Sequence, residues 1–471
     1  MKRLLSVLLI SLTLIAGGAP DVLAQVTRKA DSKATQATGT ARNATQVPAA
    51  PRKSNTQAAT PVARTTDFFN QYFYDKALRV DYVHAGNDTS DFYAIDELIS
   101  EPYYAGSKTN TVSPFDFGNY RAVLTDAATG TVIWQQGYSS LFSEWQTTAE
   151  ARTVRRAMTE NVVFPFPKKP SVLTFYNRSK QMEWSEKFTL PINPTDMFIK
   201  HDRRHVYPHF TVKQSGDPAT SLDIVFIPEG YTAAEMDKFK ADCERFAGNL
   251  LSCEPYTKYA DRINIYGVEA PSMHSGSDVP GDGIWKNTVL NSGFYTFGID
   301  RYLTTPDMKS VRDVAANAPY DQICIVVNSP VYGGGGIYNF YALFTSDNAY
   351  ADYVFVHEFG HSFGGLGDEY YESEVAYEDM YDLRFEPWEP NLTTLVDFDS
   401  KWKNMTDAGA PVPTPETMKS TVKVGAYEGG GYLNKGIYRP SHDCSMKSGT
   451  FNNFCPVCKD ALSRMIESYL Q

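Results

Sequence analysis

The segment FVHEFGHSFGGLGDEYYE, residues 355–372, combines an apolar run, two histidines four positions apart and a glycine-rich turn that leads into acidic residues. At about 100° per residue in an α-helix, His357 and His361 project from one face, one turn apart. Gly364 and Gly365 can end such a helix, because glycine readily adopts the conformation that often follows a helix. The segment therefore predicts a helix that presents two imidazoles on the same side.

This spacing allows both imidazoles to bind one zinc ion, and Glu358 lies beside the first of them. Zinc lowers the pKa of a water molecule and polarises a peptide carbonyl, so Glu358 can act as the general base that takes a proton from the zinc-activated water. With only eight histidines in the chain, a chance H-E-x-x-H is expected about once in a hundred such sequences. An ordinary amphipathic helix is therefore the weaker interpretation.

A catalytic zinc site usually has three protein ligands and one open position, so a third ligand is needed. In metzincins this ligand lies ten residues after the first histidine, and that position is Gly367 here. Asp368 follows at position eleven, and we predict it as the third ligand because the glycine gives the backbone freedom to turn it back. The rivals are Glu369, Glu372 and His442. Glu369 could instead orient a ligand histidine through its second ring nitrogen.

The segment SHDCSMKSGTFNNFCPVC, residues 441–458, places Met446 in a turn rich in serine and glycine before the last helix. A methionine in a turn beneath the zinc is a second mark of metzincins. Cys444, Cys455 and Cys458 flank this turn, and we predict that disulfides staple it. A separate cysteine-type zinc site is the alternative, but only three cysteines lie close together in the sequence.

Two further assignments concern the substrate. We predict that the hydroxyl of Tyr438, a few residues before the methionine turn, polarises the scissile carbonyl or stabilises the oxyanion alongside zinc. The alternative is a packed core tyrosine. The segment GIYNFYALF, residues 336–344, directly precedes the histidine helix and predicts an edge strand with which a substrate backbone could pair.

The start of the chain predicts export. Residues 1–24 have a basic start, a short apolar run and a small-residue end, which is typical of a secretory signal peptide, with a membrane anchor as the weaker interpretation. Residues 25–65 are rich in Ala, Thr, Gln and Pro and predict a disordered linker. We expect a secreted, periplasmic or cell-surface protein without a transmembrane segment in the mature chain. The net charge of −11 argues against a nucleic-acid partner.

The remaining chain has two patterns. Residues 66–204 contain short aromatic and β-branched runs separated by turns, which predicts an N-terminal all-β sandwich with a supporting or recognition role. Residues 205–471 contain apolar strands, a helix opened by a capping box of Thr232 and Glu235, and the histidine helix. This order predicts an α/β domain with a mixed sheet. Cys324 lies in an apolar strand and is predicted to be a buried free thiol.

Several segments together resemble the M64 peptidases, the IgA-peptidase group of metallopeptidases: HEFGHSFGGLGDEY, SGSDVPGDG, YGGGG and GGGYLNKGIYRPSHDCSM. The preceding β-rich half resembles the N-terminal domain found with them. The resemblance implies an α/β zincin, metzincin-like catalytic domain with Zn²⁺ held by His357, His361 and Asp368, and with Glu358 as the catalytic base. It implies a protein or peptide substrate without identifying it, and it leaves the oligomeric state open.

The expected function is therefore that of an exported zinc-dependent endopeptidase. The alternative is a non-catalytic binding or adhesion protein at the cell surface, whose β-sandwich binds and whose zinc is structural. The intact Glu358 favours the enzyme, because a structural zinc site has no need of a base.

Overall fold

The structure, a computed structural model, describes residues 64–371 and 380–471. The predicted signal peptide and nearly all of the predicted linker lie outside the described residues, as does Glu372, so these expectations stay predictions. The domain boundaries at residues 65 and 204 also stay predictions. Among the described helices, none combines the length and the apolar character that a membrane span requires.

The first part of the described chain is strand-rich, as predicted. Its strands form two antiparallel sheets with the orders β2-β1-β5 and β4-β3-β6-β7. The strands are β1 (Phe73–Gly86), β2 (Asp91–Glu101), β3 (Tyr120–Asp126), β4 (Val132–Tyr138), β5 (Arg156–Pro167), β6 (Ser171–Arg178) and β7 (Trp184–Ile192). Val80 of one sheet and Leu124 and Phe175 of the other belong to one buried core, so the two sheets pack as a sandwich. Two short helices, α1 (Thr66–Tyr72) and α2 (Leu141–Trp145), accompany them.

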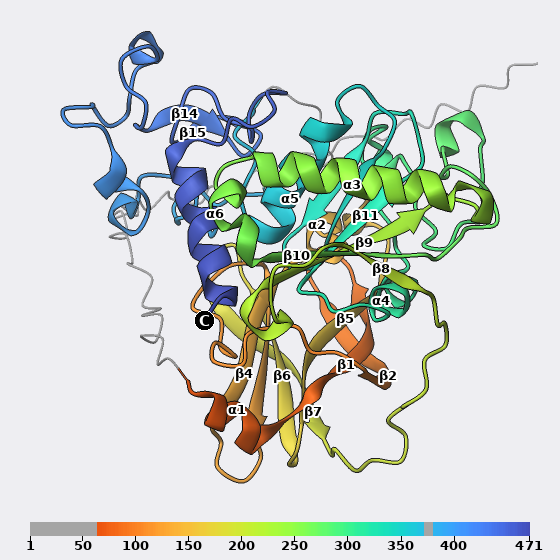
Figure 1. Cartoon of the computed structure of the whole chain (residues 1–471). Coiled ribbons are helices and arrows are strands. Elements are labelled where there is room, and N and C mark those ends of the chain that lie inside the picture. Colours follow the sequence, from red (N-terminus) through yellow and green to blue (C-terminus); the bar gives the residue numbers. More distant parts are fainter. Residues whose placement is uncertain (1–63, 372–379) are drawn as a thin grey trace, which may run out of the picture. The chain divides into compact units, whose positions relative to one another are not determined.

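The second part contains the predicted mixed sheet, with the order β12-β13-β11-β9-β10-β8. Figure 1 labels its strands β8, β9, β10 and β11. Its strands are β8 (His209–Lys213), β9 (Leu222–Glu229), β10 (Ile263–Val268), β11 (Gln322–Val327), β12 (Gly334–Ile337) and β13 (Tyr341–Thr345). The four central strands are parallel, while β12 and β8 are antiparallel to their neighbours. A separate hairpin joins β14 (Tyr427–Gly430) to β15 (Leu433–Arg439).

Helices cover both faces of this sheet, because successive residues of a strand point to opposite sides. Ile224 and Phe226 of β9 pack in the core that contains α3 (Met236–Ser252), α5 (Ala351–Gly364) and α6 (Pro456–Tyr469). Val225 and Ile227 pack on the other side with α4 (Met308–Ala315). The predicted capping box of Thr232 and Glu235 is present just before α3.

The predicted edge strand over residues 336–344 is wrong. The segment turns at Asn339, which has a φ of 51°, and divides into the end of β12 and the start of β13. The second strand is internal, between β12 and β11. The strand that contains the glycine run, β12, forms the edge of the sheet. On its outer side, the N–H of Gly334 donates to the carbonyl of Arg301, and its carbonyl accepts from the N–H of Leu303. Substrate pairing along residues 341–344, which belong to the internal strand, is therefore excluded.

The two parts contact each other through buried polar groups. Arg79 of β1 is fully buried and forms ion pairs with Glu101 of β2 and with Asp313 of α4. The side chain of Arg312 donates to Asn161 of β5 at 2.9 Å. Because a buried charge is costly unless it is paired, these contacts tie the strand-rich part to the α4 face of the mixed sheet.

The glycines of β12 are required by the close approach of α5. A Cβ at Gly336 would lie 2.2 Å from the carbonyl oxygen of Glu358 and 2.9 Å from Cβ of His361. A Cβ at Gly334 would lie 2.7 Å from Oε1 of Glu358. The edge strand can therefore pack directly against the helix that carries both histidines.

We expect Gly336→Ala to destabilise the protein by roughly 1–3 kcal/mol, because the added methyl group overpacks against helix backbone that cannot move aside. Gly248→Ala is the matched control, since a Cβ there meets nothing within 4 Å and alanine stabilises a helix interior by about 1 kcal/mol relative to glycine. Thermal unfolding of the two variants checks this. An unchanged melting temperature in Gly336→Ala would contradict the packing described.

Candidate active site

Three donor groups meet at the end of α5. Nε2 of His357 and Nε2 of His361 lie 3.1 Å apart. Oδ1 of Asp368 lies 3.1 Å from the first nitrogen and 3.3 Å from the second. Zinc with nitrogen and oxygen ligands at about 2.0–2.1 Å has ligand-to-ligand edges of about 3.3 Å. The three atoms thus form a triangle of the size of one face of a tetrahedral zinc site.

The turn after α5 brings Asp368 back toward the histidines. Gly365 has a φ of 63°, and its N–H donates to the carbonyl of His361. A glycine supports this reversal, as predicted. The residue with the left-handed conformation is Gly365, however, and not Gly367. Gly367 is needed for a different reason, because a Cβ there would lie 2.5 Å from Cδ1 of Leu392.

Both histidines are oriented by backbone carbonyls. Nδ1 of His357 is 2.9 Å from the carbonyl oxygen of Ser445, and Nδ1 of His361 is 2.6 Å from that of Leu366. When Nδ1 donates to a carbonyl, Nε2 carries the lone pair that can bind a metal. The predicted alternative for Glu369, orienting a histidine, is therefore wrong. Its carboxylate accepts from Asn391 instead.

The two carboxylate oxygens of Asp368 have different surroundings. Oδ1 is buried and has no hydrogen bond within the described residues, although it faces both imidazoles. Oδ2 accepts a hydrogen bond from the hydroxyl of Tyr432. Burial alone would raise the pKa of Asp368, but the two histidines hold it well below its ordinary value. The carboxyl group therefore stays ionised, and its Oδ1, which faces both imidazoles, fits a cation between the three donors.

Glu358 and the three donor residues line one cavity of about 1080 Å³. Glu358 is half-buried. Burial raises its pKa above the ordinary value, and the neighbouring His357 and His361 oppose that rise. A carboxylate with a raised pKa beside an open cavity is suited to accept a proton at neutral pH.

Met446 lies beneath the histidine helix. It is fully buried, and its sulfur would be 2.9 Å from a Cβ at Gly360, between the two histidines. The neighbouring Ser445 is the residue whose carbonyl orients His357. The predicted turn therefore supports the site from below through both packing and a hydrogen bond.

Tyr438 is not brought to the three donors. It lies in β15, its backbone pairs with Thr393, and it does not line the cavity. Tyr432, at the start of the same hairpin, lines the cavity and bonds Asp368. No local sequence signal distinguishes these two tyrosines. Nδ1 of His442, a rival ligand, is instead hydrogen-bonded to the carboxylate of Glu416.

The predicted disulfides are wrong. All six cysteines are free and buried. The prediction that Cys324 is a buried free thiol is confirmed. Cys444, Cys455 and Cys458 instead lie together with Glu369, and none of the four lines the cavity.

A helix that carries H-E-x-x-H, a returning carboxylate and a shared cavity define a candidate metal-dependent hydrolase. The family comparison agrees. The IgA Peptidase M64 family matches residues 210–422 and 416–466, and the Peptidase M64 N-terminus matches residues 68–189. The chain therefore belongs to the M64 family of metallopeptidases, as its sequence resemblance predicted, and is a peptidase. No match to this chain was found among curated proteins.

The two tyrosines of the hairpin provide a matched test of the site. We expect Tyr432→Phe to weaken Zn²⁺ binding about 10- to 100-fold, because it removes the donor that holds the metal-facing carboxylate. Tyr438→Phe should leave Zn²⁺ affinity and turnover unchanged. Competition with a chelator of known affinity measures the first quantity. Loss of turnover in Tyr438→Phe with normal binding in Tyr432→Phe would restore the original assignment.

Proposed function

We propose that the protein is an exported zinc-dependent endopeptidase that hydrolyses peptide bonds of protein substrates. The observation that carries this proposal is the triangle of His357, His361 and Asp368 on the wall of a cavity of about 1080 Å³. A structural zinc site is usually closed by four protein ligands, whereas a catalytic site keeps an open position. Three donors that face a large cavity favour the catalytic kind over a non-catalytic binding protein.

The residues present fit zinc. Two imidazole nitrogens and one carboxylate oxygen are a common catalytic donor set, and the buried Oδ1 of Asp368 has no other hydrogen bond within the described chain. When bound, zinc would lower the pKa of water and polarise the scissile carbonyl. Tyr432 keeps the carboxylate of Asp368 in place, and the carbonyls of Ser445 and Leu366 keep the two imidazoles in place.

Glu358 is proposed as the general base. It follows His357 directly on α5, lines the same cavity, and has a raised pKa because of burial. Its carboxylate would take a proton from water and later deliver it to the leaving amine. The absence of a side chain at Gly334 leaves space that this carboxylate occupies.

The strand-rich part contributes to substrate recognition in this proposal. Asn119, Asn177 and Arg178 of that part line the cavity together with the histidines. Tyr332 and Tyr350 also line it, and their exposed fractions are 43% and 59%. Side-chain amides, a guanidinium and exposed rings are groups that bind the backbone and side chains of an extended peptide. The N-terminal part would then shape the substrate cleft as well as support the fold.

Export is proposed on the sequence alone. Residues 1–24 have the order of charged, apolar and small residues found in secretory signal peptides. A secreted, periplasmic or cell-surface location would bring the enzyme to extracellular proteins.

We expect Glu358→Gln to retain Zn²⁺ and to lower turnover of casein or gelatin about 10²- to 10⁴-fold, because it removes the base and leaves the metal donors intact. Glu144→Gln is the control, since Glu144 lines the same cavity but is not one of the three metal donors. A chelator should abolish wild-type activity, and Zn²⁺ should restore it. Wild-type turnover by Glu358→Gln would contradict the mechanism.

A further inference from the structure

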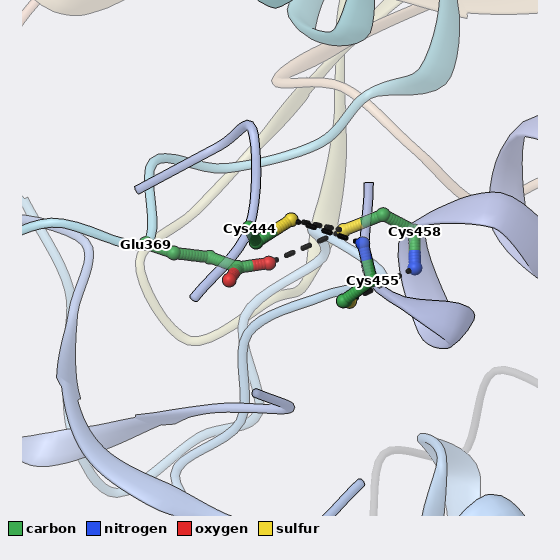
Figure 2. Close-up of side chains that lie close together, drawn as sticks. All are labelled: Glu369, Cys444, Cys455 and Cys458. Atoms are coloured by element: carbon green, nitrogen blue, oxygen red, sulfur yellow. Dashed lines mark hydrogen bonds between the residues drawn. The ribbon is translucent and has the colours of Figure 1, made fainter. Parts of the chain in front are cut away.

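A second group of possible metal donors begins at Glu369, the residue next to Asp368. Glu369 and three cysteines, Cys444, Cys455 and Cys458, place one ligand atom each within 4.8 Å of one another, and all four are buried (Figure 2). The residues come from the turn after α5, from the methionine turn and from the start of α6. None of the four lines the large cavity.

The spacing of these atoms is that of metal ligands. Sγ of Cys444 and Sγ of Cys458 are 3.7 Å apart. A tetrahedral zinc ion with Zn–S distances of about 2.3 Å has S-to-S edges of about 3.8 Å, whereas a disulfide joins its sulfurs at about 2.05 Å. Sγ of Cys458 is 3.2 Å from Oε1 of Glu369, against about 3.5 Å for a mixed sulfur and oxygen edge.

The carboxylate of Glu369 is unpartnered on one side. Oε1 bonds Asn391 and Cys458, but Oε2 is buried and has no hydrogen bond within the described residues. The exposed fraction of this residue is 0%. Figure 2 shows its carboxylate directed toward the cysteines. A buried carboxylate oxygen without a partner is costly, and a cation among the four donors would remove that cost.

Backbone N–H groups also point at the sulfurs. The N–H of Cys455 donates to Sγ of Cys444 at 3.3 Å, and the N–H of Cys458 donates to Sγ of Cys455 at 3.5 Å. Cys455 is the N-cap of α6, so its sulfur also lies at the positive end of the helix dipole. Such donors stabilise thiolates, which are the form in which cysteine binds a metal.

We propose that Glu369, Cys444, Cys455 and Cys458 form a second, structural metal site that binds Zn²⁺. Three thiolates with one carboxylate are a soft donor set suited to zinc. The site has four protein ligands and no contact with the cavity, so it is closed, as structural zinc sites are.

A metal in this second site would hold residues of the first site in position. Asp368 and Glu369 are consecutive in the chain, and Asp368 belongs to the cavity-facing donors whereas Glu369 belongs to the second site. The N–H of Glu369 donates to the carbonyl of Met446 at 2.7 Å. Between Cys444 and Met446 stands Ser445, whose carbonyl orients His357. A metal bound by Glu369 and the cysteines would therefore limit the movement of the carboxylate of Asp368 and of the imidazole of His357.

Metal content of the full chain tests the proposal without reference to activity. The double variant His357→Ala/His361→Ala removes the cavity-facing donors and should retain one Zn²⁺ per chain. Adding Cys455→Ala should reduce this to none. Adding Cys324→Ala, a buried cysteine outside the group, should leave it at one. A zinc-free double variant would overturn the second site while leaving the proposed peptidase function open to its own test.

Two measurements keep the proposal testable should Cys455→Ala fail to fold. X-ray absorption of the double variant should show about three sulfur neighbours of zinc near 2.3 Å and one oxygen near 2.0 Å. Thiol titration in denaturant with a chelator should count six thiols, because all six cysteines are free. A count of four, or a zinc shell without sulfur, would show a disulfide or another site and overturn the proposal.

Discussion

Asp368 and Glu369 follow the reversal at Gly365 in non-helical backbone, and their carboxyl groups belong to two different groups of donors. One carboxylate faces the two imidazoles, and the other faces three cysteine sulfurs. Both oxygens that face these groups are buried, so each is stable only with compensating charge nearby. The reversal in turn depends on a residue that tolerates a positive φ at the end of α5. The active-site geometry thus rests on where one helix ends.

The rest of the structure holds that helix end in place. Glycines of β12 let the sheet approach α5 within contact of the helix backbone, and Met446 packs beneath it. Carbonyls from two different turns fix the second nitrogen of each imidazole. The hairpin of β14 and β15 adds the hydroxyl of Tyr432. Each contact comes from a different segment, so the site is preorganised by the tertiary fold and not by the motif alone.

The sequence predicts those parts of the site that depend on local spacing. His357, Glu358 and His361 follow from the helical period, and Asp368 from its place just past a glycine-rich turn. Tyr432 could not be chosen over Tyr438, because its contact with Asp368 spans 64 residues. The grouping of the cysteines with Glu369 cannot be predicted from local spacing, because Glu369 lies 89 residues before Cys458. The sequence does not predict the hairpin of β12 and β13, because glycine has a low strand propensity. The glycines of β12 are required by the close approach of α5 and not by the strand itself.

Diffraction from zinc-loaded crystals, recorded at the zinc absorption edge, tests the central claim most directly. The account predicts two anomalous peaks per chain. One lies between His357, His361 and Asp368, and the other lies among Glu369 and the three cysteines. A zinc peak bound by the two histidines and Glu369, with Asp368 turned away, would contradict the account, which assigns Asp368 to the histidines and Glu369 to the cysteines.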